Sequence, residues 1–121
     1  MKVLIVDAHP PSAQYLCQGL CQDGFNVDVA HDGRQGRDMA LSRAYSLVVL
    51  DLDLPGLSGR EVLQALRRAT STPAIVVAAN DSLEDQVFCL QHGADDYLVK
   101  PIRLPVFLAR ARLRMRGSAG R

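Results

Sequence analysis

The sequence lacks the features of several specialised protein classes. Its 121 residues include no tryptophan, and aromatic residues make up only 5% of the chain. No apolar run reaches 18 residues, which argues against a membrane span. The chain opens directly into an apolar strand pattern rather than a signal peptide. We therefore expect a cytoplasmic protein with no membrane partner.

Cysteine is also scarce. The three cysteines, an odd number, argue against a disulfide framework. Cys17 and Cys21 lie four positions apart on an expected helix, where a metal or redox pair is conceivable. Two ligands without a nearby histidine or acid make a poor metal site. We expect these cysteines to be buried or half-buried packing thiols.

The composition is that of one globular domain with a single core, since 48% of residues are apolar and 22% are charged. The net charge is only +1, but arginines gather near the C-terminus. They are Arg110, Arg112, Arg114, Arg116 and Arg121. No aromatic residue interleaves them, so the pattern gives little indication of direct nucleic-acid binding.

Five short apolar segments alternate with five amphipathic ones. The strands are expected at 2–6, 25–29, 47–50, 74–78 and 97–99. The helices are expected after Ser12, at 34–42, after Ser58, after Ser82 and at 104–115. This alternation predicts an α/β fold, a (βα)5 doubly wound parallel sheet in the flavodoxin-like order 2-1-3-4-5. Residues 1–116 form the expected domain, and 117–121 a linker or frayed C-terminus.

Three charged residues follow separate strands of this expected sheet. Asp51 ends the apolar run 47–50, Asp7 follows the first strand and Lys100 follows the fifth. In an open parallel sheet, ligands bind beyond the carboxyl ends of the strands. Asp7 and Lys100 should therefore flank Asp51 in one crevice. Paired carboxylates favour a hard divalent cation, and a carboxylate beside a lysine can accept a phosphoryl group.

Three motifs carry a resemblance to a known family. They are Val3–Asp7, Leu50–Gly56 and Gly93–Pro101. Along its whole length the chain resembles the receiver domain of two-component response regulators, most closely the OmpR/PhoB-type branch. The resemblance implies a non-enzymatic signalling domain, a sensor histidine kinase as partner, and transcription control through a winged-helix DNA-binding output domain. That domain is missing from these 121 residues, so we expect a receiver cut at its linker or a stand-alone receiver.

The resemblance also implies roles for individual residues. Asp51 is the expected phosphoacceptor, and Lys100 is the phosphate-facing base. A weak Mg²⁺ site would use Asp7, Asp51 and Asp53, the last through its backbone carbonyl. The peptide bond between Lys100 and Pro101 is expected to be cis, which is inexpensive only before proline.

Two positions depart from the family pattern. The family has a second acid where Ala8 stands, and a threonine or serine where Ala78 stands. Ala78 cannot hydrogen-bond a phosphoryl group, and its switch partner Tyr97 remains. Two interpretations stay open. Either phosphorylation is weak, absent or not the main control, or Asp53 and water complete a working Mg²⁺ site.

An output face is expected on the helix after Ser82, the strand 97–99 and the last helix. Receivers of this branch dimerise there through crossing ion pairs, of which Asp95 or Asp96 with Arg110 would keep one. A second family pair is replaced by Gln86 and Val106. A homodimer and a monomer both stay open. The expected interface residues are Phe88, Leu90, Asp95, Asp96, Val106, Arg110 and Arg112.

Two other protein classes share part of this pattern. Asp51 and Asp53 resemble the paired acids of haloacid-dehalogenase-type phosphatases, but there the lysine precedes the later acids and Lys100 follows Asp95 and Asp96. A flavin carrier of the same fold needs a phosphate loop rich in amide donors after the first strand. Pro10 and Pro11 stand in that loop here. Neither class is preferred.

Overall fold

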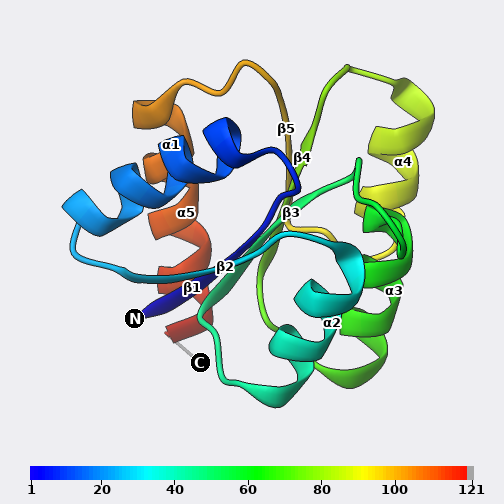
Figure 1. The fold of residues 1–121 in the computed structure, drawn as a ribbon, viewed down its shortest axis with the longest axis horizontal. Coiled ribbons are helices and arrows are strands. Elements are labelled where there is room, and N and C mark those ends of the chain that lie inside the picture. The colour runs from blue at the N-terminus through cyan, green and yellow to red at the C-terminus, as the bar shows by residue number, and fades with distance from the viewer. Residues whose placement is uncertain (120–121) are drawn as a thin grey trace.

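The computed structural model describes the backbone of residues 1–119 and the side chains of residues 1–116. Strands and helices alternate from end to end (Figure 1). The strands are β1 (Lys2–Val6), β2 (Asn26–Ala30), β3 (Leu47–Asp51), β4 (Ala74–Ala78) and β5 (Asp96–Val99). The helices are α1 (Pro10–Gln22), α2 (Gly33–Ser42), α3 (Gly59–Ala69), α4 (Leu83–Gln91) and α5 (Leu104–Ala119).

The five strands form one parallel sheet in the order β2-β1-β3-β4-β5, which confirms the predicted topology. Helices α1 and α5 cover one face of this sheet, and α2, α3 and α4 cover the other (Figure 1). Strand β3 lies at the centre, between β1 and β4. The C-terminal end of β3 therefore has neighbouring strand ends on both sides, which is where a ligand site is expected.

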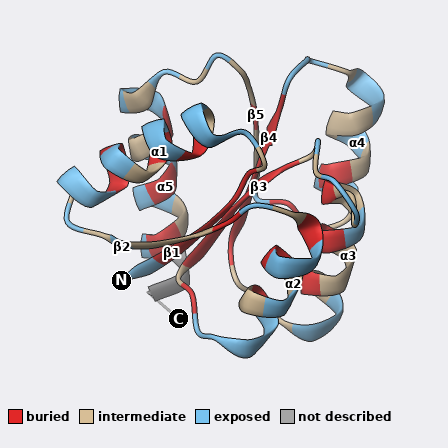
Figure 2. Ribbon diagram, viewed as in Figure 1, coloured by how far each residue is buried: buried red, intermediate tan, exposed pale blue. Residues whose placement is uncertain are grey.

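Both faces of the sheet are buried (Figure 2). Every residue of β3 and β4 is buried, as in strands covered by helices on two sides. One apolar cluster joins the sheet to α2, α3 and α4, and the other joins it to α1 and α5. In residues 1–119, no helix is both long and apolar enough to cross a membrane.

The start of α1 was predicted incorrectly. Ser12 was expected as its N-cap, but the helix begins at Pro10 and His9 is the N-cap. The two prolines fit the first turn because their missing N–H groups would have no helical partner there. The imidazole of His9 accepts a hydrogen bond from the backbone N–H of Ser12 at 3.3 Å.

The end of α5 also differs from the prediction. The helix was expected to stop at Met115 but continues to Ala119. Backbone positions 117–119, expected as a linker or frayed end, are therefore helical, and residues 120–121 lie outside the described residues. No local helix-stopping signal precedes Gly117, and Arg112, Arg114 and Met115 all favour helix. The boundary of the domain at residue 116 stays a prediction.

Candidate functional site

Three strand ends bring the predicted site residues together. Asp7 follows β1, Asp51 is the last residue of β3, and Lys100 follows β5. The Lys100 Nζ atom lies 2.7 Å from Asp51 Oδ2 and 3.8 Å from Asp7 Oδ2. Asp51 and Lys100, which are 49 positions apart in the sequence, thus meet with Asp7 in one ion-paired cluster. The predicted juxtaposition of two carboxylates and an ammonium is confirmed.

Backbone amides hold both carboxylates in place. Asp51 Oδ1 accepts a hydrogen bond from the N–H of Asp53 at 2.9 Å, and Asp7 Oδ1 accepts one from the N–H of His9 at 2.8 Å. The exposed fractions of Asp7 and Asp51 are only 3% and 4%. The tight approach of α3 helps to bury Asp51, because Gly59 packs directly against its carbonyl group. The oxygens that face Lys100 are thereby oriented before any ligand arrives.

The cluster carries more negative than positive charge. One ammonium serves two buried carboxylates, and burial raises the pKa of Asp7 above its ordinary value of 3.8. The His9 amide and Lys100 lower that pKa, while the charge of Asp51 raises it. Because burial is the largest of these effects, the net shift is toward a higher pKa for Asp7. A further cation beside the two acids would relieve this cost.

The residues present fit a Mg²⁺ ion held by few protein oxygens. Asp7 and Asp51 supply carboxylates, whereas Ala8 supplies only a methyl group. Asp53 is exposed, and its carbonyl remains a predicted ligand. Across the residues that the structure describes, no group of three His, Cys, Asp or Glu side chains is placed to hold a metal. Mg²⁺ commonly keeps several waters beside one or two carboxylates, so a weak site is compatible with this arrangement.

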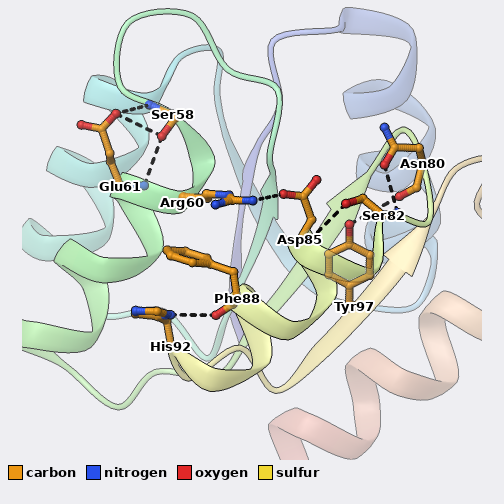
Figure 3. A network of polar contacts seen from close by, with 9 residues as sticks. All are labelled: Ser58, Arg60, Glu61, Asn80, Ser82, Asp85, Phe88, His92 and Tyr97. Carbon is orange, nitrogen blue, oxygen red and sulfur yellow. Dashed lines mark hydrogen bonds and ion pairs between the residues drawn. The ribbon is translucent and has the colours of Figure 1, made fainter.

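The predicted switch pair is close to the site but lacks its hydroxyl partner. Ala78 is buried at the end of β4, and its methyl group offers no hydrogen bond to a phosphoryl oxygen. The hydroxyl of Tyr97 donates instead to the backbone carbonyl of Asn80 at 3.4 Å (Figure 3). Burial raises the pKa of the Tyr97 phenol, so it remains a donor at neutral pH. Tyr97 is thus tied to the loop that leads into α4.

Helix α4 is fastened to α3 by a contact that sequence reasoning missed. Arg60 of α3 forms an ion pair with Asp85 of α4, and its guanidinium lies 4.4 Å from the ring centroid of Phe88 (Figure 3). Phe88 in turn stacks on His92, with ring centroids 4.0 Å apart. An arginine over an aromatic face is attractive in addition to the ion pair. No local pattern signals this link because its members come from two helices.

The charged residues predicted for the output face make ion pairs within the chain. Arg110 Nη1 lies 2.8 Å from Asp96 Oδ1, and Arg67 Nη2 lies 3.3 Å from Asp95 Oδ2. Arg112 reaches the other way, since it binds both carboxylate oxygens of Asp23 at the end of α1. These three acids therefore have partners before any second chain arrives.

The apolar residues predicted for the output face are largely exposed or half-buried. Leu90 is 51% exposed and Val106 is 45% exposed, and Phe88 is half-buried beneath Arg60. Leu83 and Val87 add to the exposed apolar surface of α4. The face predicted for association thus carries exposed apolar side chains beside ion pairs that form within the chain.

Comparison with known proteins identifies relatives of this chain. A family model described as the response regulator receiver domain matches residues 3–112. The transcriptional regulatory protein HprR of Escherichia coli is 42% identical over 116 residues, covering 96% of this chain and 52% of HprR. The chain therefore spans about half the length of the curated relatives it matches.

Solved structures agree with the fold. The receiver domain of the Francisella response regulator 1452 superposes with a TM-score of 0.92 at 30% identity, covering 97% of this chain and 98% of that one. The receiver domain of the Pseudomonas aeruginosa sensor histidine kinase PA1611 gives a TM-score of 0.87 at 26% identity, covering 94% and 96%. That structure contains a magnesium ion coordinated in the active-site cleft.

Proposed function

This chain belongs to the response regulator receiver family, a family of signalling domains, and on that basis we propose that it is a receiver whose output depends little on phosphorylation. The phosphoacceptor is retained, whereas the features that would bind metal and relay the signal are reduced. The observation that carries the proposal is the buried Ala78 beside a complete Asp51–Lys100 pair. The phosphatase and flavin-carrier alternatives gain no support from the family match.

The retained chemistry starts from Asp51. Its carboxylate oxygen would attack a phosphorus atom, form an O–P bond, and release the donor with the electrons of the broken bond. Lys100, now 2.7 Å from that carboxylate, would neutralise the phosphoryl oxygens. Mg²⁺, when bound beside Asp7 and Asp51, would supply further charge neutralisation. The Asp53 amide, which donates to the other oxygen of Asp51, would hold the carboxylate in position.

Two residues weaken this chemistry as a switch. Ala8 contributes no carboxylate to the metal, so we expect lower Mg²⁺ affinity than in a receiver with two consecutive acids. Ala78 has no hydroxyl that could hydrogen-bond the phosphoryl group and move toward it. Tyr97 therefore has no shift at position 78 to respond to. The Arg60–Asp85 pair would add a constraint, because it joins α4 to α3 without involving Asp51.

Signalling would then pass through the face formed by α4, β5 and α5. Leu83, Val87, Leu90 and Val106 are exposed there, and apolar side chains of this kind are typical of the core of an interface. The ion pairs of Asp95 and Asp96 lie within the chain, so association would not have to wait for them to form. We propose a homodimer through this face in the absence of phosphorylation.

The wider setting is inferred from relatives about twice as long as this chain. One of them is named as a transcriptional regulatory protein. We propose that this receiver belongs to a cytoplasmic transcription regulator that would bind DNA through a separate output domain. A sensor histidine kinase would be its upstream partner, even if it phosphorylates Asp51 poorly.

The test is incubation with Mg²⁺ and a small phosphodonor such as acetyl phosphate, read by intact mass. We expect little or no gain of one phosphoryl group in the wild type, and a dimer by light scattering without the donor. Asp51→Ala provides the baseline, and Ala78→Thr tests whether the hydroxyl restores a donor-dependent change in oligomeric state. A stable phosphoryl gain in the wild type that is absent from Asp51→Ala, with dimerisation only after phosphorylation, would overturn the proposal.

A further inference from the structure

Two thiols on consecutive turns of α1 lie side by side. The Sγ atoms of Cys17 and Cys21 are 4.0 Å apart. Cys17 is half-buried against the core cluster of α1 and α5, and Cys21 is exposed. The expectation of packing thiols is therefore wrong for Cys21, which leaves its sulfur open to solvent. Cys89, the third cysteine, is fully buried and packs on the opposite face of the sheet.

Helix geometry decides which kind of bridge the two sulfurs can form. On a helix, residues four apart have Cβ atoms about 5–6 Å apart, whereas a disulfide needs about 3.5–4.5 Å. A disulfide between Cys17 and Cys21 would therefore distort α1. A single metal ion is different. With metal–sulfur bonds of about 2.3 Å, sulfurs 4.0 Å apart subtend about 120° at one ion, so the helix need not move.

The donor set selects the class of ion. Soft thiolate ligands favour soft ions such as Cu(I). A structural zinc site would need four tetrahedral ligands, and no third His, Cys, Asp or Glu joins these thiols within the part of the chain that the structure describes. We propose that Cys17 and Cys21 form a two-thiolate site for one soft, low-coordinate metal ion of the Cu(I) class. On binding, each thiol releases its proton to solvent, and the third position around the ion stays open to a small external thiol.

The site is independent of the phosphoacceptor. It lies within α1, which packs beside α5 (Figure 1). The two carboxylate oxygens of Asp51 accept hydrogen bonds from Asp53 and Lys100, and neither residue belongs to α1. Metal binding at the thiols and phosphoryl transfer at Asp51 can therefore be measured separately. Asp51→Asn should leave metal binding unchanged.

The experiment is an anaerobic titration of the reduced chain with Cu(I) alone, in competition with a chromogenic Cu(I) chelator. We expect one ion per chain, and an affinity reduced by about tenfold or more in Cys17→Ser and in Cys21→Ser, because each loses one of the two metal–sulfur bonds. Cys89→Ala is the matched control and should keep full stoichiometry. Circular dichroism establishes that each variant is folded.

Three results would overturn the site. One is unchanged Cu(I) binding in the Cys17→Ser/Cys21→Ser double variant. A second is half an ion per chain, which would mean that two chains share the ion. A third is loss of binding in Cys89→Ala alone. If a serine variant is poorly folded, alkylation of the wild type replaces it as the readout, since bound Cu(I) should protect two thiols per chain from iodoacetamide.

Discussion

Replacing Lys100 with methionine would expose the electrostatic cost of the acidic cluster. The ammonium lies 2.7 Å from Asp51 Oδ2 and 3.8 Å from Asp7 Oδ2. At an effective dielectric constant of about 20, these pairs correspond to roughly 6 and 4 kcal/mol of Coulomb attraction. Those values are upper bounds because methionine also avoids the desolvation of the ammonium, although the Lys100 side chain is 25% exposed in the wild type.

The net loss of stability is therefore smaller. Removing one partner of a buried ion pair typically costs about 3–5 kcal/mol, and partial exposure of Lys100 argues for about 3 kcal/mol at pH 8. For a chain of this size, this corresponds to a fall of about 10 °C in Tm. Urea unfolding without divalent ions, followed by circular dichroism, measures the loss. Lys100→Met/Asp51→Asn should recover part of it because one uncompensated charge is gone.

The loss should also depend on pH in a defined direction. The pKa of Asp7 is already raised by burial, and Lys100 is one of the groups that lower it, so Lys100→Met should raise it further. A carboxyl group with a raised folded-state pKa destabilises the fold as pH rises through that pKa. The deficit of Lys100→Met should thus shrink between pH 8 and pH 4.

Mg²⁺ binding provides a second test of the Lys100→Met variant. An ion concentration about ten times its Kd should restore about 1.4 kcal/mol, provided that Asp7 and Asp51 bind it. If Lys100→Met is as stable as the wild type at pH 8 in the absence of divalent ions, the electrostatic account of the site is wrong. A stability deficit of Lys100→Met that grows as the pH is lowered would also contradict the electrostatic account.

Three further substitutions test the supports of the site and fold. Gly59→Ala would bring a Cβ atom against the carbonyl oxygen of Asp51, so it should cost about 1–3 kcal/mol in urea unfolding and reduce any phosphorylation of Asp51 seen by intact mass. Ser58→Ala breaks the capping box with Glu61 and should cost about 1 kcal/mol, whereas Ser58→Asp should cost less in the same assay. Tyr45→Phe removes a 2.7 Å hydrogen bond to Asp28 and should cost about 1 kcal/mol at pH 7. Because Tyr45 lowers the pKa of Asp28, that cost should fade as the pH drops below about 4, and a cost that stays constant down to pH 2 would contradict the assignment.

The strands and the position of the site were predictable because their signals are local. The run Leu47–Leu50 is apolar throughout, and Pro55 and Gly56 interrupt the pattern soon after Asp51. Alternation of strands and helices then leaves few possible topologies. In the order that forms, β3 lies beside β1, and the loop after β5 reaches the same edge. The cis bond between Lys100 and Pro101, expected from the resemblance, is present.

What could not be predicted is which polar side chains meet, either within one turn or between two elements. His9 caps α1, because the turn after Asp7 points its imidazole at Ser12. Tyr15 of α1 is aromatic and yet 46% exposed. Arg60 meets Phe88 only because α3 and α4 lie side by side. Hydrophobic periodicity gives the buried face of a helix, but it does not say which polar side chains meet on the outside.

The spacing of Asp7, Asp51 and Lys100 along the chain has a consequence for biosynthesis. Proteins emerge from the ribosome with the N-terminus first, so the two acids are exposed to the cell before the lysine has been made. A nascent chain that ends before Lys100 carries both carboxylates and no internal counter-charge for them. The finished cluster therefore forms only when translation has passed the fifth strand, which ends at Val99 immediately before Lys100.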